Sequence, residues 1–275
     1  MNGENMDSQK KIMNEPQAMW LIIITLMVIN FIFYKFRIGG PDMLTLVGDL
    51  FPVISSLFAV GALIRITFYL KTWDLTKTAW LLLAFGIFCW FLGECSFAVT
   101  ELALGRTPGV PSLADGFWLC GIFPIITALI LFIYGYQRTG FLIGHTSKYI
   151  FVISAIAMLE IVLIARIGMP ILYTPNLSVL EKVVSLVYPA LDMVILMLVF
   201  FLVLITSVLG KGLLSKPWKF LVIGFALIAV ADILYSFYNW LGAYSTGSYI
   251  DMMWNSGYLF IALSAFYQKD LMEKY

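Results

Sequence analysis

Two carboxylic acids lie deep inside long apolar stretches of the sequence, and they are the residues best suited to chemistry. Glu94 follows Trp80 by fourteen positions, and Asp232 follows Trp218 by the same spacing. A charged side chain in lipid is costly and needs a partner or a water-filled cavity. Each acid therefore either forms a structural hydrogen bond or ion pair between helices, or is balanced by a proton, a cation or a cationic ligand.

The motif Ser-x-x-Asp-x-x-Trp-x-x-Gly occurs twice, around Asp115 and around Asp251. A Ser three residues before an acid has the spacing of a capping box, which satisfies free backbone amides at a helix start. Asp115 and Asp251 are therefore either helix caps or direct ligand contacts. Trp118 and Trp254, one turn deeper, are either aromatic anchors at the membrane interface or members of the same site.

The same spacing recurs across several segments, which indicates an internal duplication. Phe51-Pro52 has a counterpart in Tyr188-Pro189, and Asp192 follows the second proline by three residues. We predict two tandem four-helix repeats in parallel orientation, related by a pseudo-two-fold axis along the membrane normal. The separations are 137 residues for Pro52 and Pro189, 138 for Glu94 and Asp232, and 136 for Asp115 and Asp251.

The composition indicates that helices in a membrane position these residues. Of the 275 residues, 61% are hydrophobic and 12% are charged, whereas a soluble domain carries about 25% charged residues. Backbone amides must be paired internally in lipid, so long apolar segments are predicted to be transmembrane helices. Eight segments have the required length of about 20 residues: Met19–Phe36, Met43–Leu70, Lys77–Leu102, Leu113–Tyr136, Lys148–Met169, Val179–Leu209, Pro217–Leu241 and Ser248–Gln268.

We therefore expect an all-α, polytopic membrane protein with about eight transmembrane helices. The first repeat is predicted over residues 19–136 and the second over residues 148–268, between a polar N-terminus (1–18) and a short C-terminus (269–275). Eleven Lys and Arg residues flank the predicted spans on the side of both termini, against five on the other side. The positive-inside rule then predicts a multi-pass protein of the cell membrane with both termini cytoplasmic.

Several chemistries lack the residues that they need. The single histidine, His145, lies in a predicted cytoplasmic loop, which excludes haem ligation by two histidines in the membrane. Cys89, Cys95 and Cys120 lie in apolar segments and are interpreted as small apolar filler. No phosphate-binding loop, zinc-ligand spacing or metalloprotease motif occurs. We expect no enzymatic activity, no cofactor, no metal and no nucleic-acid partner.

The membrane acids gather on the predicted outer side, where aromatic residues are also dense. Asp232 lies fifteen residues into its span, about 22 Å along a helix that rises 1.5 Å per residue. If the repeats face each other, the acids ring an outward-facing pocket. Carboxylates beside aromatic faces can hold an organic cation, although packing and interfacial anchoring are the simpler explanation of the aromatics. The candidate ligand-binding residues are Glu94, Asp115, Asp192, Asp232, Asp251, Trp118, Trp254, Tyr188 and Tyr235.

Four short motifs together resemble the membrane-integral N-terminal sensor regions of prokaryotic signalling proteins. They are Pro111-Ser112-x-x-Asp115, Tyr188-Pro189-x-x-Asp192, Ala231-Asp232-x-x-Tyr235 and Asp251-x-x-Trp254. In that class, a region of about eight helices precedes a diguanylate cyclase, phosphodiesterase or histidine kinase module. The resemblance implies a sensory role in signal transduction for the recurrent acids. This sequence ends seven residues after Gln268, so a sensor of this kind must signal through a separate cytoplasmic or membrane protein, or the scaffold has another task.

These observations predict a stand-alone, receptor-like membrane sensor domain that binds a small ligand or cation. Binding would shift the relative tilt of the two repeats, with Pro52, Pro124 and Pro189 as candidate kink points. A secondary transporter is an alternative, because parallel repeats occur in transporters and intramembrane acids relay protons. A further alternative is a structural or assembly subunit whose acids pair with another membrane protein.

Overall fold

The computed structural model describes residues 15–138, 146–207 and 210–274. These residues form helices joined by short loops, and no strand occurs among them. Most of the polar N-terminus predicted over residues 1–18 lies outside the described residues, as does His145. The first helix is described from Glu15, so it includes four residues before the predicted Met19.

The helices follow the predicted spans closely, and their bounds differ from the predicted ones mainly at the ends. They are α1 Glu15–Phe36, α2 Gly40–Tyr69, α3 Leu75–Ala98, α4 Leu113–Arg138, α5 Thr146–Leu163, α6 Met169–Tyr173, α7 Val179–Ser207, α8 Lys216–Trp240 and α9 Tyr249–Lys274. A π-helical turn, η1 Val99–Ala103, extends α3, and a second, η2 Ile164–Gly168, joins α5 to α6. A 3-10 segment, η3 Gly210–Ser215, precedes α8.

Seven helical segments among the described residues are long and apolar enough to cross a membrane. They correspond to the first seven predicted spans, so the chain is a multi-pass helical membrane protein. The eighth predicted span, Ser248–Gln268, corresponds to α9, which has 26 residues and is about 39 Å long at 1.5 Å per residue. It carries the buried polar residues Asn255, Ser256 and Ser264, and it packs against α1, α2 and α8. A helix enclosed by protein can carry polar groups that a lipid-facing helix cannot.

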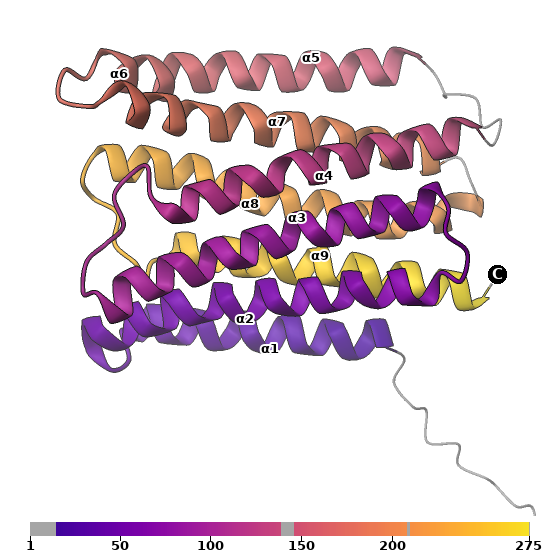
Figure 1. Cartoon of the computed structure of the whole chain (residues 1–275), viewed down its shortest axis with the longest axis horizontal. Coiled ribbons are helices and arrows are strands. Elements are labelled where there is room, and N and C mark those ends of the chain that lie inside the picture. The colour runs from indigo at the N-terminus through magenta and orange to yellow at the C-terminus, as the bar shows by residue number, and fades with distance from the viewer. Residues whose placement is uncertain (1–14, 139–145, 208–209, 275) are drawn as a thin grey trace, which may run out of the picture.

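The long helices lie side by side as a bundle (Figure 1). The loops at 37–39, 104–112, 174–178 and 241–248 gather at one end, called the loop end below. Residues 15 and 274, the first and last that the structure describes, lie at the opposite end, called the terminal end.

Aromatic rings fill the centre of the bundle toward the terminal end. Trp80 and Trp218, near the starts of α3 and α8, stack with their ring centroids 5.8 Å apart. Phe132 of α4 packs edge-on against both rings, at 4.9 Å from each. All three side chains are buried, so α3, α4 and α8 meet in a dry aromatic cluster.

Paired glycines allow α3 to approach α4, and α8 to approach α9, almost backbone to backbone. A Cβ atom placed on Gly86 would lie 2.7 Å from the carbonyl oxygen of Gly121, and one placed on Gly224 would lie 2.8 Å from that of Gly257. Such distances are too short for real Cβ atoms, so only glycine fits at these contacts. The sequence motif therefore ends in Gly because a neighbouring backbone occupies the space of a side chain.

We predict that Gly121→Ala destabilises the protein by about 1–3 kcal/mol, because the added methyl group overlaps with Gly86 and Trp90. Thermal unfolding in detergent measures the change. Gly61→Ala is the matched control, since a Cβ on this glycine of α2 meets no atom within 4 Å. Equal midpoints for Gly121→Ala and Gly61→Ala would contradict the close α3–α4 contact.

Candidate functional site

A cavity of about 220 Å³ lies inside the bundle near the loop end, between α2, α3, α4, α7, α8 and α9. The volume is large enough for several water molecules or a small organic ligand. All nine candidate site residues predicted from the sequence line this cavity: Glu94, Asp115, Trp118, Tyr188, Asp192, Asp232, Tyr235, Asp251 and Trp254. The structure thus brings the candidates together, and their role in ligand binding remains a prediction.

The wall of the cavity carries many carboxyl groups and no basic partner. None of the described residues that line it is Lys, Arg or His. Carboxylates that are withdrawn from water need hydrogen-bond donors, protons or a cation. The electrostatics of the site therefore favour a positively charged occupant. The seven lining acids are Asp49, Glu94, Asp115, Glu181, Asp192, Asp232 and Asp251.

Glu94 of α3 is held by donors from two other helices. The hydroxyl of Tyr258, on α9, donates a hydrogen bond of 2.6 Å to its Oε1 atom, and the indole N–H of Trp118, on α4, also reaches the carboxyl group. A side chain at Gly93 would overlap with the Trp118 ring, so this glycine makes the room that Trp118 needs. The candidate Glu94 is therefore positioned by aromatic donors, with no cation beside it.

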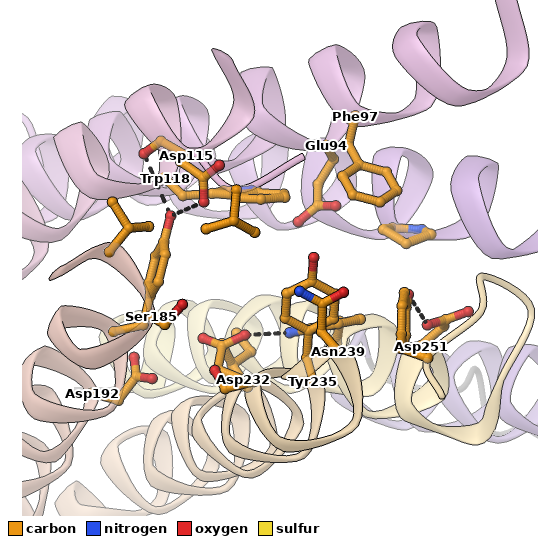
Figure 2. Close-up of a pocket in the computed structure, with 18 of the residues that line it drawn as sticks. Glu94, Phe97, Asp115, Trp118, Ser185, Asp192, Asp232, Tyr235, Asn239 and Asp251 are labelled. Carbon is orange, nitrogen blue, oxygen red and sulfur yellow. Dashed lines mark hydrogen bonds between the residues drawn. The ribbon is translucent and has the colours of Figure 1, made fainter. Parts of the chain in front are cut away.

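Asp232 of α8 has a similar partner in the second half of the chain. The indole N–H of Trp254 donates a hydrogen bond of 2.7 Å to Asp232 Oδ1 (Figure 2). The carboxyl group of Asp192, on α7, also contacts that of Asp232. Two acids in contact within a dry site repel each other unless a proton or a cation lies between them.

Asp115 and Asp251 satisfy the helix starts that the sequence predicted. Asp115 accepts hydrogen bonds from the amide and the hydroxyl of Ser112, at 2.6 and 2.8 Å, and the Tyr188 hydroxyl adds a third at 3.0 Å. Asp251 accepts from the amides of Gly247 and Ser248, at 2.6 and 3.0 Å. Both acids also line the cavity, so capping does not prevent them from facing a ligand.

Tyr244, in the loop between α8 and α9, donates a hydrogen bond of 2.9 Å to Asp251 Oδ1. Burial and the neighbouring Asp251 carboxylate raise the pKa of Tyr244 well above its usual range. The phenol therefore stays protonated at neutral pH and acts as a fixed donor at the loop end of the cavity.

The sequence analysis missed Asp49 and Tyr258. Asp49 lies on α2 three residues before Pro52, lines the cavity and is buried. The criterion that selected Glu94, an acid inside an apolar span, would also have selected Asp49. Tyr258 lies one turn beyond Trp254 on the same face of α9, so the helical period was the available signal.

Glu101 was not among the predicted site residues, and it lies in the π-helical turn η1. Its Oε2 atom accepts a hydrogen bond of 2.6 Å from Thr246 Oγ1, and its carboxyl group contacts that of Asp49. Among the described residues, π-helical turns occur at 99–103 and 164–168 only, and such turns are frequent at functional sites.

Two basic groups of the membrane region, Arg65 and Lys269, lie at the terminal end, away from the cavity. Arg65 contacts Glu15 at 2.8 Å at the terminal end, where Lys269 also contacts Glu15, at 3.2 Å. Glu160 and Arg166, six residues apart along α5 and η2, are not among the ion pairs of the described residues, and Glu160 Oε2 has no hydrogen-bond donor there. At the terminal end these basic groups are thus paired with an acid, whereas no basic residue is among the described residues that line the cavity.

Comparison of the chain with protein families, curated proteins and solved structures found no match. The apolar helices of the chain place it in the class of helical membrane proteins.

We predict that Tyr258→Phe lowers stability by about 1–3 kcal/mol, because it removes the donor to Glu94 inside the bundle. Thermal unfolding in detergent measures the loss. Tyr173→Phe serves as the control, since Tyr173 is exposed at the end of α6. The same loss in both variants would show that the Tyr258–Glu94 hydrogen bond does not contribute.

Proposed function

We propose that this membrane protein is a receptor-like sensor that binds a small organic cation in the acidic cavity. The composition of the cavity wall carries the proposal: seven acids and nine aromatic residues line it, and none of its described residues is basic. An ammonium group offsets the charge of buried carboxylates and is attracted to the faces of Trp and Tyr. A binding role needs no catalytic group, and we propose that the protein is not an enzyme.

We further propose that the chain consists of two parallel four-helix repeats with eight transmembrane helices in total. The Gly86–Gly121 contact and the Gly224–Gly257 contact support this arrangement, because they join corresponding helices at nearly constant sequence offsets. The approach of an indole to an acid one helix earlier, of Trp118 to Glu94 and of Trp254 to Asp232, supports it as well. The cavity would then lie between the repeats.

The packing on the terminal side of the cavity favours a sensor over a transporter. Trp80, Phe132 and Trp218 form a buried aromatic cluster there, whereas a transport path needs polar groups or water along its length. The four motifs that resemble prokaryotic sensor regions also support a sensory role. Ligand binding would act by a population shift in the relative tilt of the repeats, with Pro52 and Pro189, which line or adjoin the cavity, as kink points.

We expect the purified protein to be stabilised by a small organic cation through the membrane acids. At 100 times its dissociation constant, a ligand that binds only the folded state adds about 2.7 kcal/mol. A thermal-unfolding scan over pH, monovalent and divalent cations and small amines tests this for wild type and for Glu94→Gln/Asp232→Asn. We expect an amine to raise the midpoint of wild type and to leave that of the variant unchanged.

Two results decide between the functions. If no cation or amine shifts the wild-type midpoint, and the variant is as stable as wild type, the acids are structural or face a protein partner. If an amine binds and proteoliposomes accumulate it in labelled form, with uptake abolished by Asp232→Asn, the protein is a transporter instead of a sensor.

We propose that the terminal end faces the cytoplasm, because Lys and Arg predominate on that side of the predicted spans. Arg106→Cys at the loop end and Lys71→Cys at the terminal end test this in a background without Cys89, Cys95 and Cys120. A membrane-impermeant maleimide should label intact cells at position 106 only, and permeabilised cells at both positions. Labelling of position 71 in intact cells would show that the terminal end faces outward and that the proposed orientation is wrong.

A further inference from the structure

Two pairs of acids from different helices lie at the cavity. Asp192, Asp232 and Asp49 line it, and Glu101 contacts Asp49 without lining it. Asp192 of α7 and Asp232 of α8 form the first group, called the α7–α8 pair. Asp49 of α2 and Glu101 of the turn η1 form the second, called the α2–η1 pair, with Asp251 beside it. In Figure 2, Asp192 and Asp251 lie on opposite sides of the site, with Asp232 and Tyr235 between them.

The α7–α8 pair has an unsatisfied carboxyl oxygen. Asp192 exposes 4% of its surface, and its Oδ2 atom has no hydrogen-bond donor among the described residues. Asp232 is satisfied on one oxygen by Trp254. The other charged neighbour of Asp192 is Glu160, from α5, which is a further acid. A positively charged donor is the group that this pair lacks.

The α2–η1 pair has the same deficiency. Asp49 also exposes 4% of its surface, and its Oδ2 atom has no donor among the described residues. Glu101 is satisfied by Thr246 and Thr107. A Cβ on the adjacent Gly48 would lie 3.1 Å from Asp251 Oδ2, so α2 packs directly against this third acid. Each pair thus contains one acid, Asp192 or Asp49, that lines the cavity and whose buried Oδ2 atom has no donor in the described part of the chain.

Aromatic rings line the cavity along with the two pairs. Tyr235 and Trp254 pack edge-on with centroids 5.7 Å apart, and Trp118 and Tyr258 line the same cavity from α4 and α9. Such rings offer an apolar wall to a methylene chain and a favourable face to an ammonium group. No group of three or more His, Cys, Asp or Glu in the described part of the chain is placed to hold a metal ion.

We propose that the cavity takes a linear aliphatic diamine, with one ammonium group at the α7–α8 pair and the other at the α2–η1 pair. This inference rests on the proposed cation-binding function and specifies the class of ligand. Each ammonium carries three N–H donors, which supply the missing donor at Asp192 and at Asp49. A monoamine can satisfy only one pair and leaves the other carboxyl oxygen without a donor.

The test compares n-alkylamines of three to six carbons with the corresponding terminal diamines, by isothermal titration of the purified wild-type protein at constant pH and salt. Once one end is bound, the second end binds with a high effective concentration. We expect the diamine of optimal length to bind about 100-fold more tightly than the monoamine of that length. Asp192→Asn and Asp49→Asn should each bring the diamine to the affinity of the monoamine.

Asp42→Asn is the matched control, because Asp42 is exposed at the start of the helix that carries Asp49, and it should retain the preference for the diamine. Retained monoamine binding by Asp192→Asn and Asp49→Asn shows that these variants are folded. Equal affinities of monoamines and diamines at every length would overturn the two-headed site and leave the cation site standing. If no amine binds and stability follows pH alone, protons fill both pairs, and the proposed function fails as well.

Discussion

The enclosure of carboxyl groups among apolar helices is the constraint on which the structure depends, and four of the acids that line the cavity, Asp49, Asp115, Asp192 and Asp251, are buried. Each carboxyl needs donors, because an unpaired charge in a dry site costs several kcal/mol. The fold supplies donors from aromatic residues and backbone amides rather than from lysines and arginines: Tyr258 and Trp118 serve Glu94, Trp254 serves Asp232, and the 247–248 amides serve Asp251. Neutral donors hold these groups without cancelling their charge, so the site keeps an attraction for cations.

This constraint also explains the glycines and the central place of α9. An indole can reach an acid on the neighbouring helix only when the two helices lie close, and Gly93 leaves the space that the Trp118 ring occupies. Helix α9 bears Asp251, Trp254 and Tyr258 toward the cavity. It packs against α1, α2 and α8, and its polar residues Asn255, Ser256 and Ser264 are buried. The least apolar of the eight long helices is therefore the one that the rest of the bundle covers.

Much of the fold was predictable because lipid imposes a simple rule on sequence. Long apolar stretches must be helical, and each of the eight predicted spans corresponds to a long helix of the structure. The nine candidate residues share one cavity because acids within a membrane face the interior of the helix bundle or a polar cavity rather than lipid. Asp49 was missed, although its sequence context resembles that of Glu94. The contacts of Glu101 could not be predicted from the sequence. Glu101 lies in the π-helical turn Val99–Ala103, where side chains point in other directions than the 3.6-residue period of an α-helix predicts.

Helix α9 lines the cavity near its start and reaches the terminal end of the bundle with its last residues. Asp251 and Trp254 take part in the site at the start of α9, and Lys269 near its end contacts Glu15 of α1 at 3.2 Å. Glu15 in turn contacts Arg65 of α2 at 2.8 Å. The Arg65–Glu15 pair is exposed and adds little stability, whereas Lys269 is buried. Together the two pairs connect three helices at the terminal end. A helix moves largely as a rigid rod, so a rotation of α9 caused at Trp254 or Tyr258 must change these contacts. The arrangement therefore provides a physical link between the cavity and the terminal end without a polar channel between them.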